Sequence, residues 1–267
     1  MSGRETTSRQ EHILLLGASG VSGLDLIQQH LELPDNNDKP YLTLYIRSSG
    51  RAKIANVLPA TKTSDTPAAK IRIVEGALDN KDAIRAALSA DSSFPRATVV
   101  ISLLGAYMSL WHFLTRTKPT PIGDALRDVV VPVMRELGVT RIMVLSTPTA
   151  FSIPGESKNK SWGWYVNSWI PYIVVPQGNA EMKAIAEAVL DNGGQTLKAV
   201  EGLEPTVFRV PFLTDDAAKL EVAAFVFGDK NTTENKSLSR ASMNRWLLEE
   251  IKNRQWIDNA PMLSNRV

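Results

Sequence analysis

The chain has 267 residues, of which 43% are hydrophobic and 22% charged, and its formal net charge is +2. We expect a soluble globular protein of one large domain or two small ones. The small net charge argues against nucleic acid or an anionic membrane as a partner. The absence of cysteine excludes disulfides, thiolate catalysis and thiolate metal ligands, and it fits the reducing cytoplasm.

The sequence shows no signal for secretion or for membrane insertion. The first ten residues are polar and lack the apolar segment of a signal peptide. No apolar run approaches the roughly 18 residues of a membrane span. We therefore expect a cytoplasmic protein.

Short apolar runs alternate with helical patterns along the chain. We predict strands at Ile13–Leu16, Tyr41–Ile46, Ile71–Val74, Thr98–Leu103, Ile142–Leu145 and Thr206–Val210. Most of these are continuously apolar, as in a parallel sheet that is covered on both faces. We predict helices at Val21–Leu31, Lys81–Leu88, Gly123–Leu137 and Ala180–Leu190. The alternation predicts a Rossmann-type, doubly wound α/β fold with right-handed crossovers.

One predicted helix contains a proline. Pro132 lies within Gly123–Leu137, where a proline removes a backbone hydrogen bond. We therefore expect either a kink or a different helix boundary at this point.

The first predicted strand runs into a glycine-spaced turn. The segment GASGVSG spans residues 17–23, and a helical pattern follows at once. In such a unit the N–H groups and dipole of the helix start favour a dinucleotide pyrophosphate, and glycines allow close approach of the backbone. The residues expected to bind it are Gly17, Ser19, Gly20, Val21 and Gly23. The alternative is a turn that only packs the helix on the strand.

Basic residues follow the second predicted strand, where a site for NAD has an acid. Arg47, Ser48 and Arg51 lie in a window without a carboxylate. Arg47 can pair with a 2′-phosphate through charge-assisted hydrogen bonds, and Ser48 can donate another. We therefore predict NADP(H) as the cofactor. The alternative is that these residues and Lys53 form a solvated basic edge.

The next three strand ends also face the predicted cofactor, because ligands of open α/β sheets lie beyond the carboxyl ends of the strands. Asp79 follows the third strand, where it can accept from the adenine amino group or cap the helix that starts near Lys81. Leu104 and Gly105 follow the fourth strand and let the cofactor pass closely. Ser146 ends the fifth strand, where the nicotinamide should lie.

Several of these segments resemble the NmrA-like group of atypical short-chain dehydrogenases. They are GASGVSG, Asp79, the strand end Val144-Leu145-Ser146 and the segment FRVPFL at residues 208–213, joined by similar stretches at 237–248 and 260–261. The resemblance spans roughly residues 11–264. It implies that the segment containing Pro211, Phe212 and Leu213 runs past the nicotinamide. Some fungal members of this group tailor alkaloids and polyketides as reductases or cyclases.

We divide the chain into three parts. We expect residues 1–10 to be a disordered tail and residues 11–203 to form the NADP-binding domain. Residues 204–267 are expected to form a small substrate-covering part of the same domain, with an amphipathic helix at Ser239–Lys252.

The usual catalytic pair of short-chain dehydrogenases is missing. In Tyr-x-x-x-Lys the lysine lowers the pKa of the tyrosine, which then protonates the alkoxide. Here Tyr165 is followed four residues later by Trp169, and Tyr172 by Pro176. Ser146 can stand at the serine position, but the spacing of Lys183 does not match. We therefore do not expect the ordinary carbonyl-reductase mechanism.

Aromatic residues gather in two segments that should cover the nicotinamide. Four of the six tryptophans lie there. Such rings bind flat, apolar or cationic ligands. The residues expected to line the substrate site are Tyr107, Trp111, Trp162, Trp164 and Trp169. Alternatively, these rings pack an insertion onto the body or form a dimer interface.

A few polar residues complete the catalytic candidates. They are Tyr165, Trp169, Ser146, Asp128 and Arg127. Arg127 and Asp128 can equally form an exposed helix surface. His112 can act as an acid–base group or simply pack among its aromatic neighbours. The three histidines are scattered, so we predict no metal site.

These features favour an NADPH-dependent reductase of a bulky, hydrophobic aromatic small molecule, with hydride transfer to an activated C=N or C=C bond. A Diels–Alder or Pictet–Spengler cyclisation can accompany or replace the reduction. The alternative is a non-catalytic NADP(H) sensor with a protein partner. We expect a monomer or homodimer that binds neither nucleic acid nor membrane.

Overall fold

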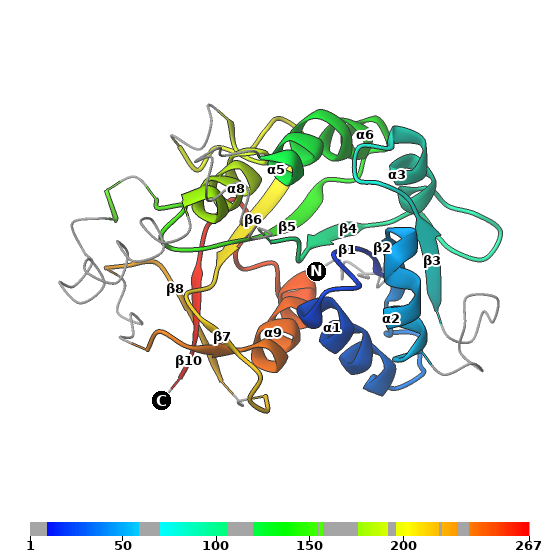
Figure 1. Cartoon of the computed structure of the whole chain (residues 1–267), viewed down its shortest axis with the longest axis horizontal. Coiled ribbons are helices and arrows are strands. Elements are labelled where there is room, and N and C mark those ends of the chain that lie inside the picture. The colour runs from blue at the N-terminus through cyan, green and yellow to red at the C-terminus, as the bar shows by residue number, and fades with distance from the viewer. Residues whose placement is uncertain are drawn as a thin grey trace, which may run out of the picture.

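The computed structural model describes residues 10–58, 70–105, 120–153, 155–156, 176–191, 196–218, 221–228 and 235–266. They form an eight-stranded sheet between two layers of helices (Figure 1). The strand order is β3-β2-β1-β4-β5-β6-β10-β8. This architecture confirms the predicted Rossmann-type, doubly wound fold.

Six parallel strands make up most of the sheet. They are β1 (His12–Leu16), β2 (Tyr41–Ile46), β3 (Ile71–Glu75), β4 (Val99–Ser102), β5 (Arg141–Ser146) and β6 (Glu204–Arg209). The chain runs outward from β1 to β3, returns to β4 on the other side of β1, and runs outward again. The sheet therefore has its topological switch between β1 and β4, the place where such folds bind ligands.

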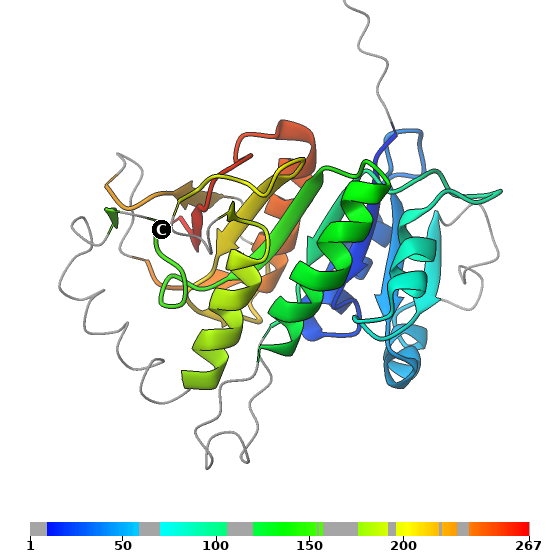
Figure 2. The same cartoon turned by 90° about the horizontal axis from the view of Figure 1, so that it is seen from above.

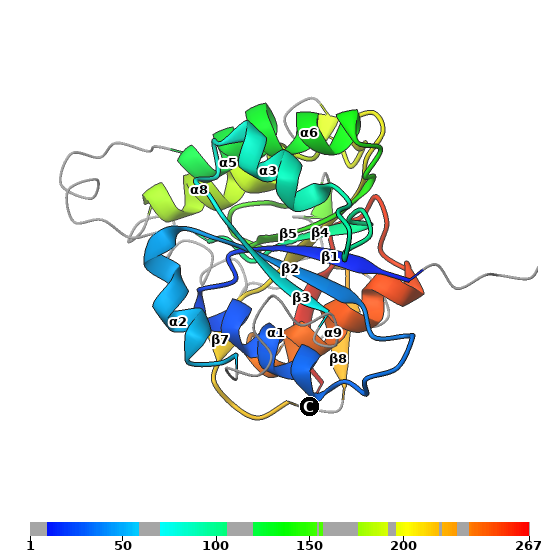
Figure 3. The same cartoon turned by 90° about the vertical axis from the view of Figure 1, so that its right-hand side faces the viewer.

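The helices cover both faces of the sheet (Figure 3). One face carries α1 (Val21–Glu32), α2 (Arg51–Ala55) and α9 (Arg240–Asn253), with the short 3-10 turn η1 (Ser48–Gly50) before α2. The other carries α3 (Lys81–Leu88), α5 (Pro121–Ala125), η4 (Leu126–Val130), α6 (Val131–Glu136) and α8 (Pro176–Glu187). Among the described residues, no helix is long and apolar enough to cross a membrane.

The sheet separates two apolar cores. Alternate residues of β1 enter them, since Leu14 and Leu16 lie on the face of α3, α6 and α8, whereas Ile13 and Leu15 lie on the face of α1 and α9. All four side chains are fully buried. Burial of such a side chain contributes about 1.5–3 kcal/mol, which explains why this strand is apolar throughout rather than alternating.

The predicted helix Gly123–Leu137 is interrupted, as Pro132 suggested. A π-helical segment, η4, separates α5 from α6, and Pro132 lies in the first turn of α6. A π turn absorbs the steric clash of a proline with the preceding turn. Figure 2 shows this composite helix beside α8. The two pack closely, because a β-carbon on Gly123 would lie 2.5 Å from that of Ala184.

The C-terminal residues extend the main sheet. β10 (Met262–Asn265) pairs in parallel with β6 and antiparallel with β8 (Val222–Phe225). A separate small sheet joins β7 (Leu213–Thr214) to β9 (Leu238–Ser239). The side chain of Ser239 then caps α9 by accepting from the Ser242 N–H. Residues 204–266 thus contribute strands to the sheet itself, and their role in covering a substrate stays a prediction.

Candidate functional site

The glycine loop joins β1 to α1 at the switch point. Gly17 has a φ of +86°, and a β-carbon on it would lie 3.0 Å from the carbonyl carbon of Leu103 after β4. A β-carbon on Gly23 would lie 2.4 Å from the Gly17 carbonyl oxygen. Both glycines are therefore required by close backbone packing. This packing is compatible both with a cofactor-binding loop and with the alternative of a turn that only packs the helix on the strand, so the pyrophosphate contact stays a prediction.

The start of α1 is open to an anion. Gly20, the residue before the helix, provides no side-chain cap, and the first turn carries no acidic residue. The first N–H groups of a helix lack intrahelical partners and carry partial positive charge. Gly20 and Val21 are exposed at this point. The exposed start of α1, called here the pyrophosphate cradle, therefore has the chemistry that favours a pyrophosphate.

The basic loop after β2 lies against the glycine loop. A β-carbon on Gly50 would lie 2.8 Å from the Ser19 β-carbon, so the two loops are in close contact. Arg47 and Ser48 lie in this loop and are exposed. A basic group is thus held beside the predicted pyrophosphate cradle, at the end of the second strand, where the adenosine ribose lies in such folds.

Glu75 is a residue of this region that the sequence analysis missed. It ends β3 beside Ile46 of β2, and its carboxylate pairs with Arg51 at 2.5 Å. Both side chains are at least one-third exposed, so the pair adds little stability. The window after β2 has no carboxylate in sequence, yet the sheet register brings one to Arg51. The parallel pairing of the second and third predicted strands could have indicated this neighbour.

Asp79 does not cap α3. The cap is Asn80, whose side chain accepts from the Ala83 N–H, so the capping alternative for Asp79 was wrong. The adjoining loop is held by Tyr45, whose hydroxyl donates to the Ala77 carbonyl oxygen at 2.7 Å. Burial, and then the nearby Asp79 carboxylate, raise the pKa of Tyr45 to about 12. Asp79 is exposed, and its contact with adenine stays a prediction.

The ends of β4 and β5 differ in how closely other residues surround them. A β-carbon on Gly105 would meet no atom of the described residues within 4 Å, so none of them closes this strand end. Ser146, by contrast, is fully buried, and its hydroxyl donates to the Met182 carbonyl oxygen of α8 at 2.9 Å. The hydroxyl therefore links β5 to α8. The catalytic role and the cofactor contact predicted for Ser146 stay predictions, as do those of Leu104 and Gly105.

The segment after β6 exposes an aromatic ring. Phe212 is 65% exposed and Val21 is 63% exposed, and they are the exposed large hydrophobic residues among those that the structure describes. Both belong to segments predicted to bind the cofactor. Isolated exposed apolar side chains are ordinary, but their restriction to these segments is consistent with a ligand surface. Pro211 and Leu213 are half-buried on either side of Phe212.

Arg127 and Asp128 lie on the exposed surface of η4. The Arg127 guanidinium pairs with Asp124 at 2.8 Å and with Asp128 at 2.9 Å. All three side chains are at least 47% exposed. Their exposure agrees with the alternative that Arg127 and Asp128 form a helix surface. The catalytic role of the two residues stays a prediction. Lys183 likewise forms an exposed ion pair with Glu187 on α8.

The aromatic candidates fall outside the described residues. They are Tyr107, Trp111, His112, Trp162, Trp164, Tyr165 and Trp169. Their roles as substrate wall or catalytic groups therefore stay predictions. In the described part of the chain, no group of three histidine, aspartate or glutamate side chains could hold a metal ion.

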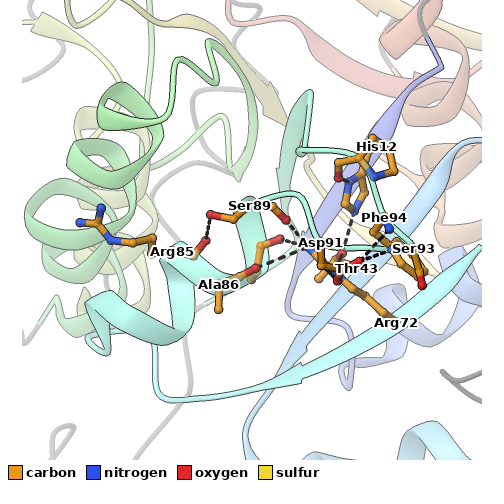
Figure 4. A network of polar contacts seen from close by, with 11 residues as sticks. His12, Thr43, Arg72, Arg85, Ala86, Ser89, Asp91, Ser93 and Phe94 are labelled. Atoms are coloured by element: carbon orange, nitrogen blue, oxygen red, sulfur yellow. Dashed lines mark hydrogen bonds and ion pairs between the residues drawn. The ribbon is translucent and has the colours of Figure 1, made fainter.

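The amino-terminal part of the sheet carries a buried polar network (Figure 4). The His12 Nδ1 lies 2.5 Å from the Pro95 carbonyl oxygen, and its Nε2 lies 2.7 Å from the Thr43 hydroxyl. Arg72 donates to the same hydroxyl at 2.7 Å and pairs with Asp91 at 2.5 Å. Thr43 can donate to the ring while it accepts from Arg72, which leaves His12 neutral and protonated on Nδ1.

Burial lowers the pKa of His12 to about 4. Burial also lowers the pKa of His30 to about 4. The Nε2 of His30 lies 2.7 Å from the Pro40 carbonyl oxygen. Both histidines lie away from the carboxyl edge of the sheet, and they serve the fold rather than the candidate site.

Comparison with known proteins agrees with this geometry. The family model described as NAD(P)H-binding matches residues 17–254. No curated protein matches the chain significantly.

Solved structures share the fold at low sequence identity. A short-chain dehydrogenase/reductase from Veillonella parvula, in complex with NADP, has a TM-score of 0.63 at 16% identity, covering 96% of this chain and 95% of its own. An anaerobillin reductase from Escherichia coli O157:H7 has a TM-score of 0.61 at 16% identity, covering 95% and 96%. The oxidoreductase ylbE from Lactococcus lactis has a TM-score of 0.58 at 13% identity, covering 96% and 91%.

Proposed function

This chain belongs to the NAD(P)H-binding family, and from that premise we propose that it is an NADPH-dependent reductase of a bulky aromatic small molecule. The bond reduced is an activated C=N or C=C. Within the family, the chain is proposed to be an NmrA-like member that works as a monomer or homodimer.

The arrangement at the start of α1 carries this proposal. Gly17 and Gly23 are required by close packing, and the helix begins without a side-chain cap or an acidic first turn. The exposed Arg47 lies in the loop after β2, and Gly50 of this loop packs closely against Ser19. An arginine at this place favours the 2′-phosphate of NADPH over the 2′-hydroxyl of NADH.

Bound NADPH supplies a hydride from its nicotinamide ring. The N–H groups at the start of α1 would hold the pyrophosphate, Arg47 and Ser48 would hold the 2′-phosphate, and the segment 210–213 would contact the nicotinamide half. The likeness in fold to solved structures that include an anaerobillin reductase supports a reductase rather than a particular substrate.

The missing catalytic pair restricts the substrate. None of the five tyrosines is followed by a lysine four residues later. A strong general acid is needed to protonate an alkoxide, whereas an iminium carbon or a conjugated C=C accepts hydride with less help. This favours the activated substrates named above, with Tyr165 or Asp128 handling a proton.

A finer version of the proposal includes cyclisation. The predicted aromatic residues would fold the substrate into a reactive conformation, an entropic contribution of up to about 7–11 kcal/mol in well-oriented systems. A Diels–Alder or Pictet–Spengler step in natural-product or alkaloid tailoring would then accompany or replace the reduction.

The second candidate is an NADP(H) sensor without turnover. The observation that favours it is the Ser146 hydroxyl, which is buried and donates to the Met182 carbonyl oxygen. While it donates to Met182, this hydroxyl cannot also donate a hydrogen bond to a substrate at the nicotinamide. Together with the missing tyrosine–lysine pair, this favours binding without catalysis.

NADPH fluorescence distinguishes the two candidates. The purified protein is titrated with NADPH and NADH, and NADPH decay is then followed with iminium, quinone, flavin and enone compounds. We expect tighter binding of NADPH and consumption with at least one class, which the Gly23→Ala variant should lose. Binding without consumption supports the sensor or a redox-neutral cyclase. Failure to bind either nucleotide contradicts both candidates.

A further inference from the structure

A buried ion pair lies directly behind the segment 210–213. Arg209 ends β6, and Glu156 lies in the chain that follows β5. The two side chains are fully buried and form a bidentate pair, with Nη1 to Oε2 at 2.6 Å and Nη2 to Oε1 at 2.7 Å. A planar guanidinium fixes the direction of its partner in such a pair.

The pair connects four parts of the fold. The Arg209 Nε donates to the Ala260 carbonyl oxygen at 2.8 Å. The Glu156 carboxylate accepts from the N–H groups of Ile153 at 3.0 Å and Phe227 at 3.2 Å. Burial would raise the pKa of Glu156, but hydrogen bonds and the charge of Arg209 hold it below its usual range. The chain after β5, the end of β6, the chain before β10 and the turn after β8 therefore meet at one pair.

Stability alone does not explain such a pair. Desolvation of two buried charges offsets much of their attraction, and well-packed apolar residues often replace a buried pair without loss of stability. The pair instead fixes the position of Arg209, and therefore that of the segment 210–213, which follows Arg209 directly.

The segment 210–213 is held at both ends. The Val210 N–H donates to the Ser146 carbonyl oxygen at 3.0 Å, and the Phe212 carbonyl oxygen accepts from the Leu238 N–H at 2.8 Å. Beyond it, β7 pairs with β9. Phe212 nevertheless remains 65% exposed between these attachments. The backbone is thus fixed while its outer surface stays available.

We propose that Arg209 and Glu156 are positioning residues, which fix the segment 210–213 against the nicotinamide half of NADPH and tie it to the chain after β5. This rests on the proposed function. The two residues do not touch the cofactor; they act through the backbone between Arg209 and Leu213. Loss of the pair should therefore weaken the binding of the nicotinamide half selectively.

A comparison of two ligands distinguishes the binding of the two halves of the cofactor. NADPH carries the nicotinamide, whereas 2′,5′-ADP keeps only the adenosine half with its 2′-phosphate. For Arg209→Lys and Glu156→Gln we expect the Kd of NADPH to rise about tenfold, and that of 2′,5′-ADP to change less than about twofold. The fluorescence anisotropy of bound NADPH should fall as the ring gains freedom.

The chain contains a matched control. Arg141, at the start of β5, pairs with Glu250 of α9 at 3.3 Å, and both side chains are 2% exposed. This pair lies at the opposite end of the strands. Arg141→Lys should leave the ratio of the two affinities unchanged, even where it lowers stability.

A double variant addresses folding. Arg209→Met with Glu156→Leu removes both charges together, so that neither is left buried without its partner. Urea denaturation checks that this variant is folded, and the folded variant should still lose NADPH affinity selectively. Equal changes in the two affinities, or none, in the folded variants would overturn the inference and leave the proposed function standing. If the wild-type protein binds neither ligand, the proposed function fails, and this inference fails with it.

Discussion

The two ends of the parallel strands use polar groups in opposite ways. At the amino-terminal end, His12, Thr43 and Arg72 are buried and bonded to one another and to nearby carbonyl oxygens. At the carboxyl end, α1 begins without a side-chain cap, and no described atom would lie within 4 Å of a β-carbon on Gly105. A polar group that is satisfied within the protein contributes to the fold, whereas one left unsatisfied is available to a ligand.

Two buried arginine–glutamate pairs in the described part of the chain lie at opposite ends of the strands. Arg141–Glu250 joins the start of β5 to α9. Arg209–Glu156 lies behind an exposed segment at the carboxyl edge. The chemistry of the two pairs is alike, so their places in the sheet decide what each one does. Four substitutions or conditions test the difference between the two ends.

Gly23→Ala should have the largest effect on the affinity for NADPH. Its β-carbon would lie 2.4 Å from the Gly17 carbonyl oxygen, so the loop must shift and the N–H cradle is lost. We expect the Kd of NADPH to rise at least about 100-fold, which is ~2.7 kcal/mol. Gly138→Ala is the control, because its φ is +66° but an added β-carbon would meet no atom of the described residues within 4 Å. It should cost about 1–2 kcal/mol of stability and leave binding intact.

Acid should destabilise the protein through the amino-terminal network. The pKa of His12 is about 4 in the folded protein and about 6.5 in the unfolded chain. The unfolded chain therefore binds the extra proton, and stability falls as pH drops from 6.5 towards 4, by roughly 1.5 kcal/mol between pH 6.5 and 5. Urea denaturation at several pH values measures this. His12→Gln should remove part of the slope, and an unchanged slope would contradict the assignment.

Arg47→Ala should weaken NADPH binding by about 10- to 100-fold, because a charge-assisted hydrogen bond contributes about 1.5–3 kcal/mol. NADH carries no 2′-phosphate, so its Kd should stay the same. Lys53→Ala is the control for a general basic edge, since Lys53 is also exposed nearby. Equal losses for both nucleotides in the Arg47 variant would favour the solvated-edge alternative.

Tyr45→Phe should have the smallest effect. It removes the hydrogen bond to the Ala77 carbonyl oxygen, which lowers the free energy of unfolding by about 1 kcal/mol. If Asp79 accepts from adenine, the affinities for NADPH and NADH should fall together and slightly. Tyr41→Phe at the other end of the same strand is the control in both thermal unfolding and titration.

Much of the fold could be predicted from local pattern. The strand Tyr41–Ile46 and the helix Lys81–Leu88 were predicted with their observed bounds. The other strands of the parallel sheet were found within a few residues, because buried parallel strands are continuously apolar. Strands β8 and β10 were missed. They are short and pair antiparallel at the edge of the sheet, where no long apolar run is required.

The candidate site was predictable only where one segment forms it. The glycine loop and the basic residues after β2 are local features, and a family match to NAD(P)H-binding proteins supports the interpretation of the loop. The contact between Glu75 and Arg51 depends on the strand register. The identity of the helix cap, Asn80 rather than Asp79, depends on where the helix begins. Neither is decided by residue type alone.

The amino-acid sequence by itself determined the strand–turn–helix unit, since glycine spacing and apolar runs act through the local backbone and its burial. Only the tertiary structure decided which distant charges meet. Arg209 and Glu156 are 53 positions apart, and pairing across such a separation depends on how β5, β6 and β8 are placed together. The same holds for the hydroxyl of Ser146, which packing turns toward α8.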